Sequence, residues 1–409
     1  MKLPFLTCLL FPVLLTAAPV AVQIIPGKGL TRGGQPYFIK GAGGTEHLEE
    51  LAKRGGNSIR TWSTDGLGGI LDNAQQHGLT VCAGIWLEPE CDWFSYAKPE
   101  HCARQMERVT KAVREFREHP ALLFWGLGNE QEGDGKNAAY WQQLNALAQM
   151  VHKEDPAHPT FTALAGMTAE KAAGMNEHAP HLDFAGINTY GALPGLREHL
   201  AKVKWTRPWA VTEYGPQGFW ERPRAEWGAP FEQTSTEKAA VMRGSYQKAI
   251  APGGDCWGGY AFLWGHKQEA TATWFGLITP EGETTASVDA LEELWTGKAP
   301  ANRAPDLAPL KLSVAKLKPG ESFTATATAT DPDKDTLTWH WSVCPESAGR
   351  DAKGQEKVPA PEAAAVVKSG EGTAAFHAPA KAGAWRVFLR VTDGKGHAAT
   401  ANAPFQVQK

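Results

Sequence analysis

A predicted apolar strand runs straight into a glutamate in the stretch Phe124-Trp125-Gly126-Leu127-Gly128-Asn129-Glu130. The same pattern returns about eighty residues later, in Pro208-Trp209-Ala210-Val211-Thr212-Glu213-Tyr214-Gly215. Each glutamate follows the carboxyl end of its strand. In a closed barrel of parallel strands these ends lie on one face, so we expect Glu130 and Glu213 to lie close together.

The sequence around these segments alternates short apolar runs with amphipathic stretches, which is the pattern of repeated βα units. Helical spacing of apolar residues is found in 103–118, 138–152 and 236–250. The glycines at 41, 43 and 44 do not have the dinucleotide-binding spacing. We therefore predict an α/β fold, a (β/α)8 TIM barrel, with strands at 37–42, 58–62, 80–86, 122–127, 160–164, 184–188, 209–212 and 259–264.

A second, smaller domain is predicted after the barrel. Residues 299–309 are rich in proline, and beyond them alternating strands without intervening helices indicate an all-β sandwich. We expect a signal peptide over 1–21, the barrel over 22–298, a Pro-rich linker over 299–309 and the sandwich over 310–409. Asp331, Asp333 and Asp335 have oxygens that suit calcium, but we favour a solvated turn there, and no metal site is predicted.

Composition excludes several classes of function. The chain has 41 basic and 44 acidic residues among 409, so nothing favours nucleic acid as a partner. Residues 1–18 have the short basic start and the apolar run of a secretory signal. We expect a secreted or periplasmic protein without membrane insertion once the signal is removed.

Six cysteines and sixteen tryptophans add two expectations. After signal removal five cysteines remain, and Cys91 with Cys102 is the most plausible disulfide. No cysteine cluster has the spacing of a zinc site. Tryptophan rings offer the flat apolar faces on which sugars stack, although most tryptophans fill protein cores.

Two convergent carboxyl groups suggest hydrolysis of a glycosidic bond. Retention of configuration needs two carboxyl groups roughly 5 to 5.5 Å apart, one protonated and one ionised. A strand-end glutamate alone is more often a solvated loop residue, but two in one barrel favour this chemistry. The expected substrate is an oligo- or polysaccharide, and no cofactor is implied.

The chain resembles the clan of retaining (β/α)8 glycoside hydrolases through Asn129-Glu130 after strand 4 and Thr212-Glu213-Tyr214-Gly215 at strand 7. Within the clan it looks most like the barrel module of glycoside hydrolase family 2. It lacks the sandwich domains that normally precede that barrel. Some similarity to β-1,3-glucanosyltransferases lies in Phe38-Ile39-Lys40-Gly41 and Asn57-Ser58-Ile59-Arg60. The second domain resembles immunoglobulin-like or polycystic-kidney-type modules, through 329–333 and 391–396.

This resemblance implies a role for each site residue. Glu213 would be the nucleophile and Glu130 the acid/base. Asn129 would bind the sugar 2-hydroxyl, and Arg60 and Tyr190 would hold the nucleophile. Trp264 would form the floor beneath the sugar, and we add Trp86 as a further substrate contact.

Three alternatives stay open at this point. A transglycosylase would use the same two carboxylates but transfer the glycosyl group to a sugar hydroxyl. A non-catalytic carbohydrate-binding barrel would keep the tryptophans and lose one carboxylate, yet both are present. An adhesive surface protein would account for the sandwich but leave the paired glutamates unexplained.

Overall fold

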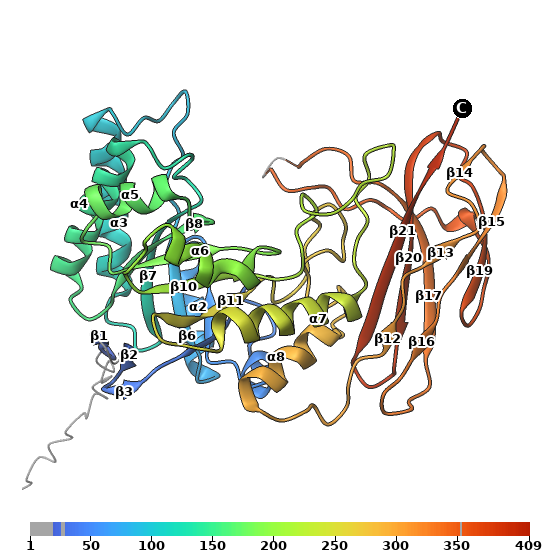
Figure 1. The fold of residues 1–409 in the computed structure, drawn as a ribbon, viewed down its shortest axis with the longest axis horizontal. Coiled ribbons are helices and arrows are strands. Elements are labelled where there is room, and N and C mark those ends of the chain that lie inside the picture. The colour runs from blue at the N-terminus through green and yellow to red at the C-terminus, as the bar shows by residue number, and fades with distance from the viewer. Residues whose placement is uncertain (1–18, 26–28, 352–353) are drawn as a thin grey trace, which may run out of the picture.

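The computed structural model describes residues 19–25, 29–351 and 354–409; most of the predicted signal peptide therefore lies outside the described residues. Within these ranges, eight strands form a closed barrel in the order β10-β11-β4-β5-β6-β7-β8-β9, and every neighbouring pair is parallel (Figure 1). The strands are β4 (Ile39–Gly43), β5 (Ser58–Arg60), β6 (Thr80–Ile85), β7 (Leu122–Asn129), β8 (Thr160–Ala165), β9 (Phe184–Asn188), β10 (Trp209–Tyr214) and β11 (Cys256–Ala261). The predicted TIM barrel is confirmed.

Each barrel strand is followed by a helix, as the alternating pattern predicts. Polar caps start several of them: Asn137 accepts a hydrogen bond from the N–H of Tyr140 at the start of α4, and Thr234 forms a capping box with Glu237 at the start of α7. The helices are α1 (Leu48–Lys53), α2 (Leu67–Gln76), α3 (Pro99–Phe116), α4 (Ala138–Glu154), α5 (Ala169–His178), α6 (Leu196–Lys202) after the 3-10 turn η1 (Leu193–Gly195), α7 (Ser235–Ser245) continuing into the π-helix η2 (Tyr246–Ile250), and α8 (Ala286–Thr296).

Aromatic side chains fill one end of the barrel. Phe161 stacks on Phe184 with ring centroids 4.9 Å apart, and Phe124 meets both rings edge-on. A Cβ on Gly126 or Gly186 would come within 2.8 Å of the Phe161 ring, so these strand positions must be glycine. The three-stranded sheet of β1 (Val22–Ile25), β2 (Gly29–Arg32) and β3 (Gln35–Pro36) packs on this cluster. This end of the barrel is thus closed, and the carboxyl ends of the barrel strands lie at the opposite end.

The predicted all-β domain is also present. Its two four-stranded sheets have the orders β13-β15-β19-β18 and β14-β21-β20-β17, with a two-stranded sheet β12-β16 beside them. Buried side chains from both larger sheets form one core. The strands are β12 (Asp306–Leu307), β13 (Lys311–Leu312), β14 (Lys316–Leu317), β15 (Ser322–Thr326), β16 (Ala329–Thr330), β17 (Thr338–Pro345), β18 (Val366–Ser369) after the 3-10 turn η3 (Ala363–Ala365), β19 (Thr373–His377), β20 (Gly383–Thr392) and β21 (Ala398–Val407).

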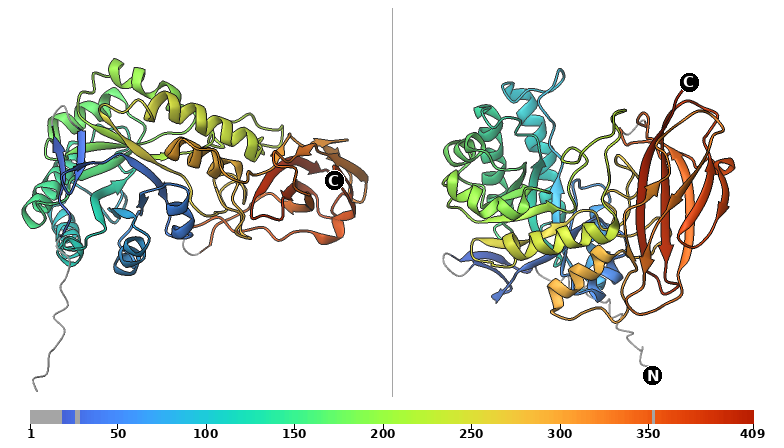
Figure 2. Two further views of the ribbon diagram at one scale, coloured as in Figure 1. Left: turned by 90° about the horizontal axis from the view of Figure 1, so that it is seen from below. Right: turned by 45° about the vertical axis from the view of Figure 1, so that its right-hand side comes forward.

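The sandwich packs directly against the barrel, beside α7 and α8 (Figures 1 and 2). Arg386 of β20, which is 1% exposed, donates to the carbonyl of Pro230 at 2.9 Å, to Asn402 Oδ1 at 2.6 Å and to Glu346 Oε1 at 2.9 Å. Asn402 in turn donates to Glu232 in the barrel. A buried polar network therefore joins the two domains.

The linker is held in place as well. Ala304 donates its N–H to Asp289 of α8, and Arg303 forms an ion pair with Asp333. Ala304 and Leu307 are buried. The Pro-rich segment is thus a docked connection between the domains.

Two expectations need correction. Cys91 and Cys102 are both free thiols, and Cys102 donates to the carbonyl of Tyr96, so the predicted disulfide is wrong for this structure. The last barrel strand ends at Ala261, three residues before its predicted end at Trp264, because Leu263 turns away to pair with Phe275.

None of the helices in the described ranges has the length and apolar character needed to cross a bilayer.

The interdomain network yields a prediction for stability. Arg386→Met leaves the Glu346 carboxylate without its cation, and breaking a buried pair in this way costs about 3–5 kcal/mol. We therefore expect the urea concentration at the midpoint of unfolding, measured by tryptophan fluorescence, to fall in this variant. Arg303→Met, which breaks an exposed ion pair, is the control and should change the urea midpoint little. An unchanged midpoint in Arg386→Met would show that the network does not stabilise the fold.

Candidate active site

A cavity of about 860 Å³ opens at the carboxyl ends of the barrel strands. Glu130 and Glu213 both line it, so the two glutamates converge on one cavity as predicted. Aromatic rings make up much of the rest of the wall. The lining residues are Trp62, Asn129, Glu130, Ala165, Gly166, Asn188, Thr189, Tyr190, Ala192, Glu213, Trp220, Glu221, Phe262, Leu263, Lys267 and Glu269.

The Glu213 carboxylate is surrounded by hydrogen-bond donors. Glu213 belongs to β10 and is 7% exposed. Among the described residues, Arg60 Nη1 and Trp62 Nε1 both donate to its Oε1 at 2.8 Å, and the Tyr190 hydroxyl donates to its Oε2 at 2.9 Å. A buried cation and two neutral donors therefore hold this carboxylate in place.

The Tyr190 phenol keeps its proton in this setting. Burial, followed by the negative charge of Glu213, raises the pKa of Tyr190 well above its ordinary value. The hydroxyl is therefore a donor to Glu213 over the whole physiological range.

Glu130 lies in a different environment. It follows β7 in the left-handed backbone region, at φ +57°, two residues after Gly128 at φ +83°. A Cβ on Gly128 would also lie 2.3 Å from Gln131 Oε1, so only glycine fits the turn that presents Glu130. A non-glycine residue in this region stores backbone strain, which is found most often at functional sites.

The pKa of Glu130 is raised above its ordinary value. Loss of water around the carboxyl group is the main cause, and the charges of Glu213 and Glu132 add to it. A hydrogen bond of 2.7 Å from Asn188 Nδ2 acts in the opposite direction. The surroundings of Glu130 thus favour its protonated form.

Two asparagines connect the glutamates through Arg60. Asn129 Oδ1 accepts from Arg60 Nη2 at 2.6 Å and from Asn188 Nδ2 at 3.1 Å. Asn188 Oδ1 accepts from Thr212 at 2.7 Å, which fixes the direction of its amide. Glu130 and Glu213 are therefore positioned by one continuous network from β5, β7, β9 and β10.

Most of the predicted site residues come together in this network: Glu130, Glu213, Arg60, Asn129 and Tyr190. Trp264 does not join them. Its side chain is 1% exposed, its indole donates to the carbonyl of His47, and it does not line the cavity because β11 ends three residues earlier. Phe262 and Leu263 lie on the wall instead. Trp86 is 43% exposed and likewise lies outside the cavity lining.

Sequence reasoning missed two members of the network. No role is predicted for Trp62, whose indole donates to Glu213. None is predicted for Asn188 either, although this side chain contacts both Asn129 and Glu130. Their positions in the sequence could have pointed to both residues. Trp62 lies two residues after Arg60, and Asn188 lies two residues before Tyr190. Side chains two residues apart lie on the same side of an extended chain.

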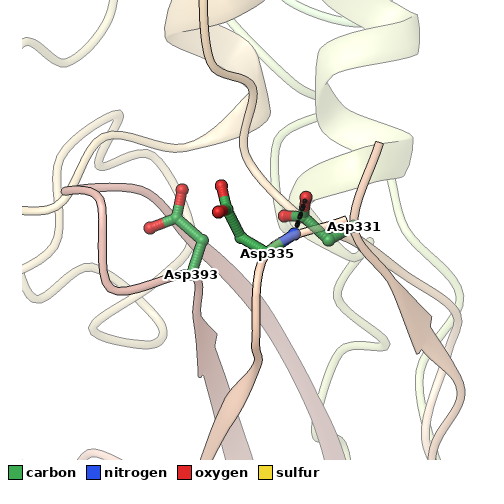
Figure 3. A group of neighbouring side chains, drawn as sticks. All are labelled: Asp331, Asp335 and Asp393. Atoms are coloured by element: carbon green, nitrogen blue, oxygen red, sulfur yellow. Dashed lines mark hydrogen bonds between the residues drawn. The ribbon is translucent and has the colours of Figure 1, made fainter. Parts of the chain in front are cut away.

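Three aspartates of the sandwich lie close together. Carboxylate oxygens of Asp331, Asp335 and Asp393 lie within 4.8 Å of one another (Figure 3). Asp331 Oδ1 accepts from the N–H groups of Asp333 and Asp335, and Asp393 Oδ1 accepts from those of Lys395 and His397. Asp333 itself pairs with Arg303. Turn hydrogen bonds thus account for much of this arrangement.

Part of the barrel is similar to a known family. Residues 68–219 match the family model of the TIM barrel domain of glycosyl hydrolases family 2. Both glutamates lie inside the matched segment. The match supports the interpretation of the barrel as a family 2 module.

Individual relatives agree with this match. A beta-glucuronidase of Pongo abelii is 26% identical over 205 residues, which is 45% of this chain and 30% of the relative. A beta-galactosidase of Leuconostoc mesenteroides is 23% identical over 116 residues, 28% of this chain and 10% of the relative. The solved structure of a beta-glucuronidase from an uncultured Clostridium species has a TM-score of 0.55 at 18% identity and covers 68% of this chain and 54% of that one, which supports the fold. This chain spans less than half the length of the curated relatives it matches.

The environment of Glu130 predicts a titration experiment. Glu213→Gln removes a negative charge that raises the pKa of Glu130, so this pKa should fall in the variant. Carbon-13 NMR of protein labelled at glutamate carboxyl groups, with Glu130→Gln to assign the signal, measures it. Glu371→Gln, on an exposed turn of the sandwich, should leave the pKa unchanged. A pKa of Glu130 that rises in Glu213→Gln would contradict the assigned charges.

Proposed function

We propose that the protein is a β-glycosidase that cleaves its substrate by double displacement, with Glu213 as nucleophile and Glu130 as acid/base. One observation carries this proposal: two glutamates line the same cavity in opposite electrostatic environments. Such a pair is what retention of configuration requires. The family 2 match and the names of the relatives, a beta-glucuronidase and a beta-galactosidase, support a glycosidase.

In the first step, a Glu213 oxygen attacks the anomeric carbon, and the bond from this carbon to the leaving oxygen breaks. Oε1 already accepts from Arg60 and Trp62, whereas Oε2 accepts from Tyr190 alone, so Oε2 is the better placed atom for attack. Glu130 gives its proton to the leaving oxygen. Its raised pKa favours the protonated form that this step needs.

In the second step, Glu130, now a carboxylate, takes a proton from water as the water oxygen attacks the anomeric carbon. The ester bond to Glu213 breaks, and the carboxylate returns to its donors. Asn129 lies beside Glu130 and is fixed by Arg60 and Asn188, which suits it to bind a sugar hydroxyl in the transition state. Transfer to a sugar hydroxyl instead of water would use the same residues.

We further propose that the protein is exported, because residues 1–18 have the composition of a secretory signal. The sandwich is proposed to be an immunoglobulin-like module on the basis of its two packed sheets, which are antiparallel except for the parallel pair β14 and β21.

The nucleophile assignment predicts a rescue experiment. Glu213→Ala should lower kcat for an aryl β-glycoside by about 10⁴-fold or more, since no covalent intermediate forms. Azide should restore part of the rate and give the α-glycosyl azide, identified by NMR. Glu371→Ala is the control and should keep full activity. Full activity in Glu213→Ala would remove the assignment.

The acid/base assignment predicts a dependence on the leaving group. Glu130→Ala should lower kcat/KM by roughly 10²- to 10⁴-fold for poor leaving groups, which need a proton, and much less for 2,4-dinitrophenol. Azide should now give the β-glycosyl azide, because Glu213 still forms the intermediate. Equal losses for both leaving groups would contradict this role for Glu130.

A further inference from the structure

The charged groups of the cavity bear on which sugars it accepts. Its lining includes four carboxyl groups, those of Glu130, Glu213, Glu221 and Glu269, and a single cation, Lys267. With the proposed function as its basis, we infer that the catalytic subsite takes an uncharged sugar and disfavours a uronate, a sugar that carries a carboxylate.

The Lys267 ammonium is already paired with a carboxylate. Its Nζ lies 2.7 Å from Glu269 Oε2 and 5.7 Å from the centroid of the Phe262 ring. The two charged side chains are 40% and 26% exposed, so the pair is partly removed from water. A uronate that bound Lys267 would have to displace Glu269 and would meet its charge in doing so.

Arg60 is not available to a substrate either. It is 2% exposed and does not belong to the cavity lining. Nη1 donates to Glu213 and to the carbonyl of Thr212, and Nη2 donates to Asn129. Of the residues described, no lining cation is left without an acidic partner.

Glu221 adds a fixed negative charge on the wall. Its Oε2 accepts from the N–H of Gly191 at 3.0 Å and from that of Gly218 at 2.7 Å. Two backbone donors thus hold the carboxylate in position. Gly191 follows Tyr190, so the Glu221 carboxylate lies against the segment that carries the phenol donating to Glu213.

These charges act differently on the two kinds of sugar. A carboxylate that leaves water needs a cation or several donors in exchange, and nearby like charges oppose it further. The hydroxyl groups of a neutral sugar find acceptors in the same carboxylates, and the C–H face of its ring can stack on the aromatic wall. The cavity therefore favours hydroxyl-rich, uncharged sugars.

The test compares kcat/KM for 4-nitrophenyl β-glycosides at fixed ionic strength. The neutral set contains the glucoside, galactoside, mannoside and xyloside, and the acidic set contains the glucuronide and galacturonide. We expect the best neutral substrate to exceed the best uronide by roughly 100-fold, since a like-charge contact costs several kcal/mol. A uronide that equals or exceeds every neutral substrate overturns the inference.

The Glu213→Ala variant distinguishes failure of the inferred sugar preference from failure of the proposed function. Uronide hydrolysis that is lost in Glu213→Ala leaves the glycosidase assignment intact and overturns only the sugar preference. Hydrolysis of any of these substrates that persists in Glu213→Ala, or a wild-type protein that cleaves none of them, overturns both.

A matched pair of variants tests the role of the ion pair. Glu269→Gln frees the Lys267 ammonium and should raise the ratio of uronide to neutral-sugar kcat/KM by about 10-fold, since one charge contact at a partly exposed site is worth on the order of a pKa unit. Glu269→Gln combined with Lys267→Met should return the ratio to the wild-type value or below. A ratio that does not rise in Glu269→Gln overturns the claim that this pair excludes uronates.

Discussion

The buried guanidinium of Arg60 is the contact on which the rest of the site depends. It joins the Glu213 carboxylate, the carbonyl of Thr212 and the amide oxygen of Asn129, and its charged end lies 5.1 Å from the ring centroid of Trp62. Only the planar fork of arginine can donate to several acceptors in this way, and lysine would lose most of these bonds. A buried cation also needs an anion beside it, and the Glu213 carboxylate lies 2.8 Å from Arg60 Nη1.

The same contact separates the behaviour of the two glutamates. Glu213 lies among donors, whereas the donor that contacts Glu130 is the neutral amide of Asn188, and its surroundings raise its pKa. The charge of Glu213 is one of the causes that raise the pKa of Glu130. The division of roles that we propose thus follows from which glutamate the arginine contacts.

The sandwich contributes to the cavity as well as to stability. The wall segment with Lys267 and Glu269 continues to Thr271 and Thr273, whose hydroxyls donate to Glu232, and Glu232 accepts from Asn402 of the sandwich. The Glu356 side chain, also from the sandwich, accepts the N–H of Ala270. The charged side of the cavity is therefore built between two domains, and its position depends on their contact.

The sequence by itself determined the barrel, the following β domain and the convergence of Glu130, Glu213, Arg60, Asn129 and Tyr190. Strand periodicity and strand-end residues are local signals, and closure of a parallel barrel necessarily brings strand ends to one face. Tertiary structure alone decided the rest. Trp264 lies outside the cavity because Leu263 pairs with Phe275, a contact between loops that no local pattern encodes. Asn188 and Trp62 join the network, and Lys267 loses its free charge to Glu269, because hydrogen bonds and ion pairs depend on side-chain positions set only when the whole barrel closes.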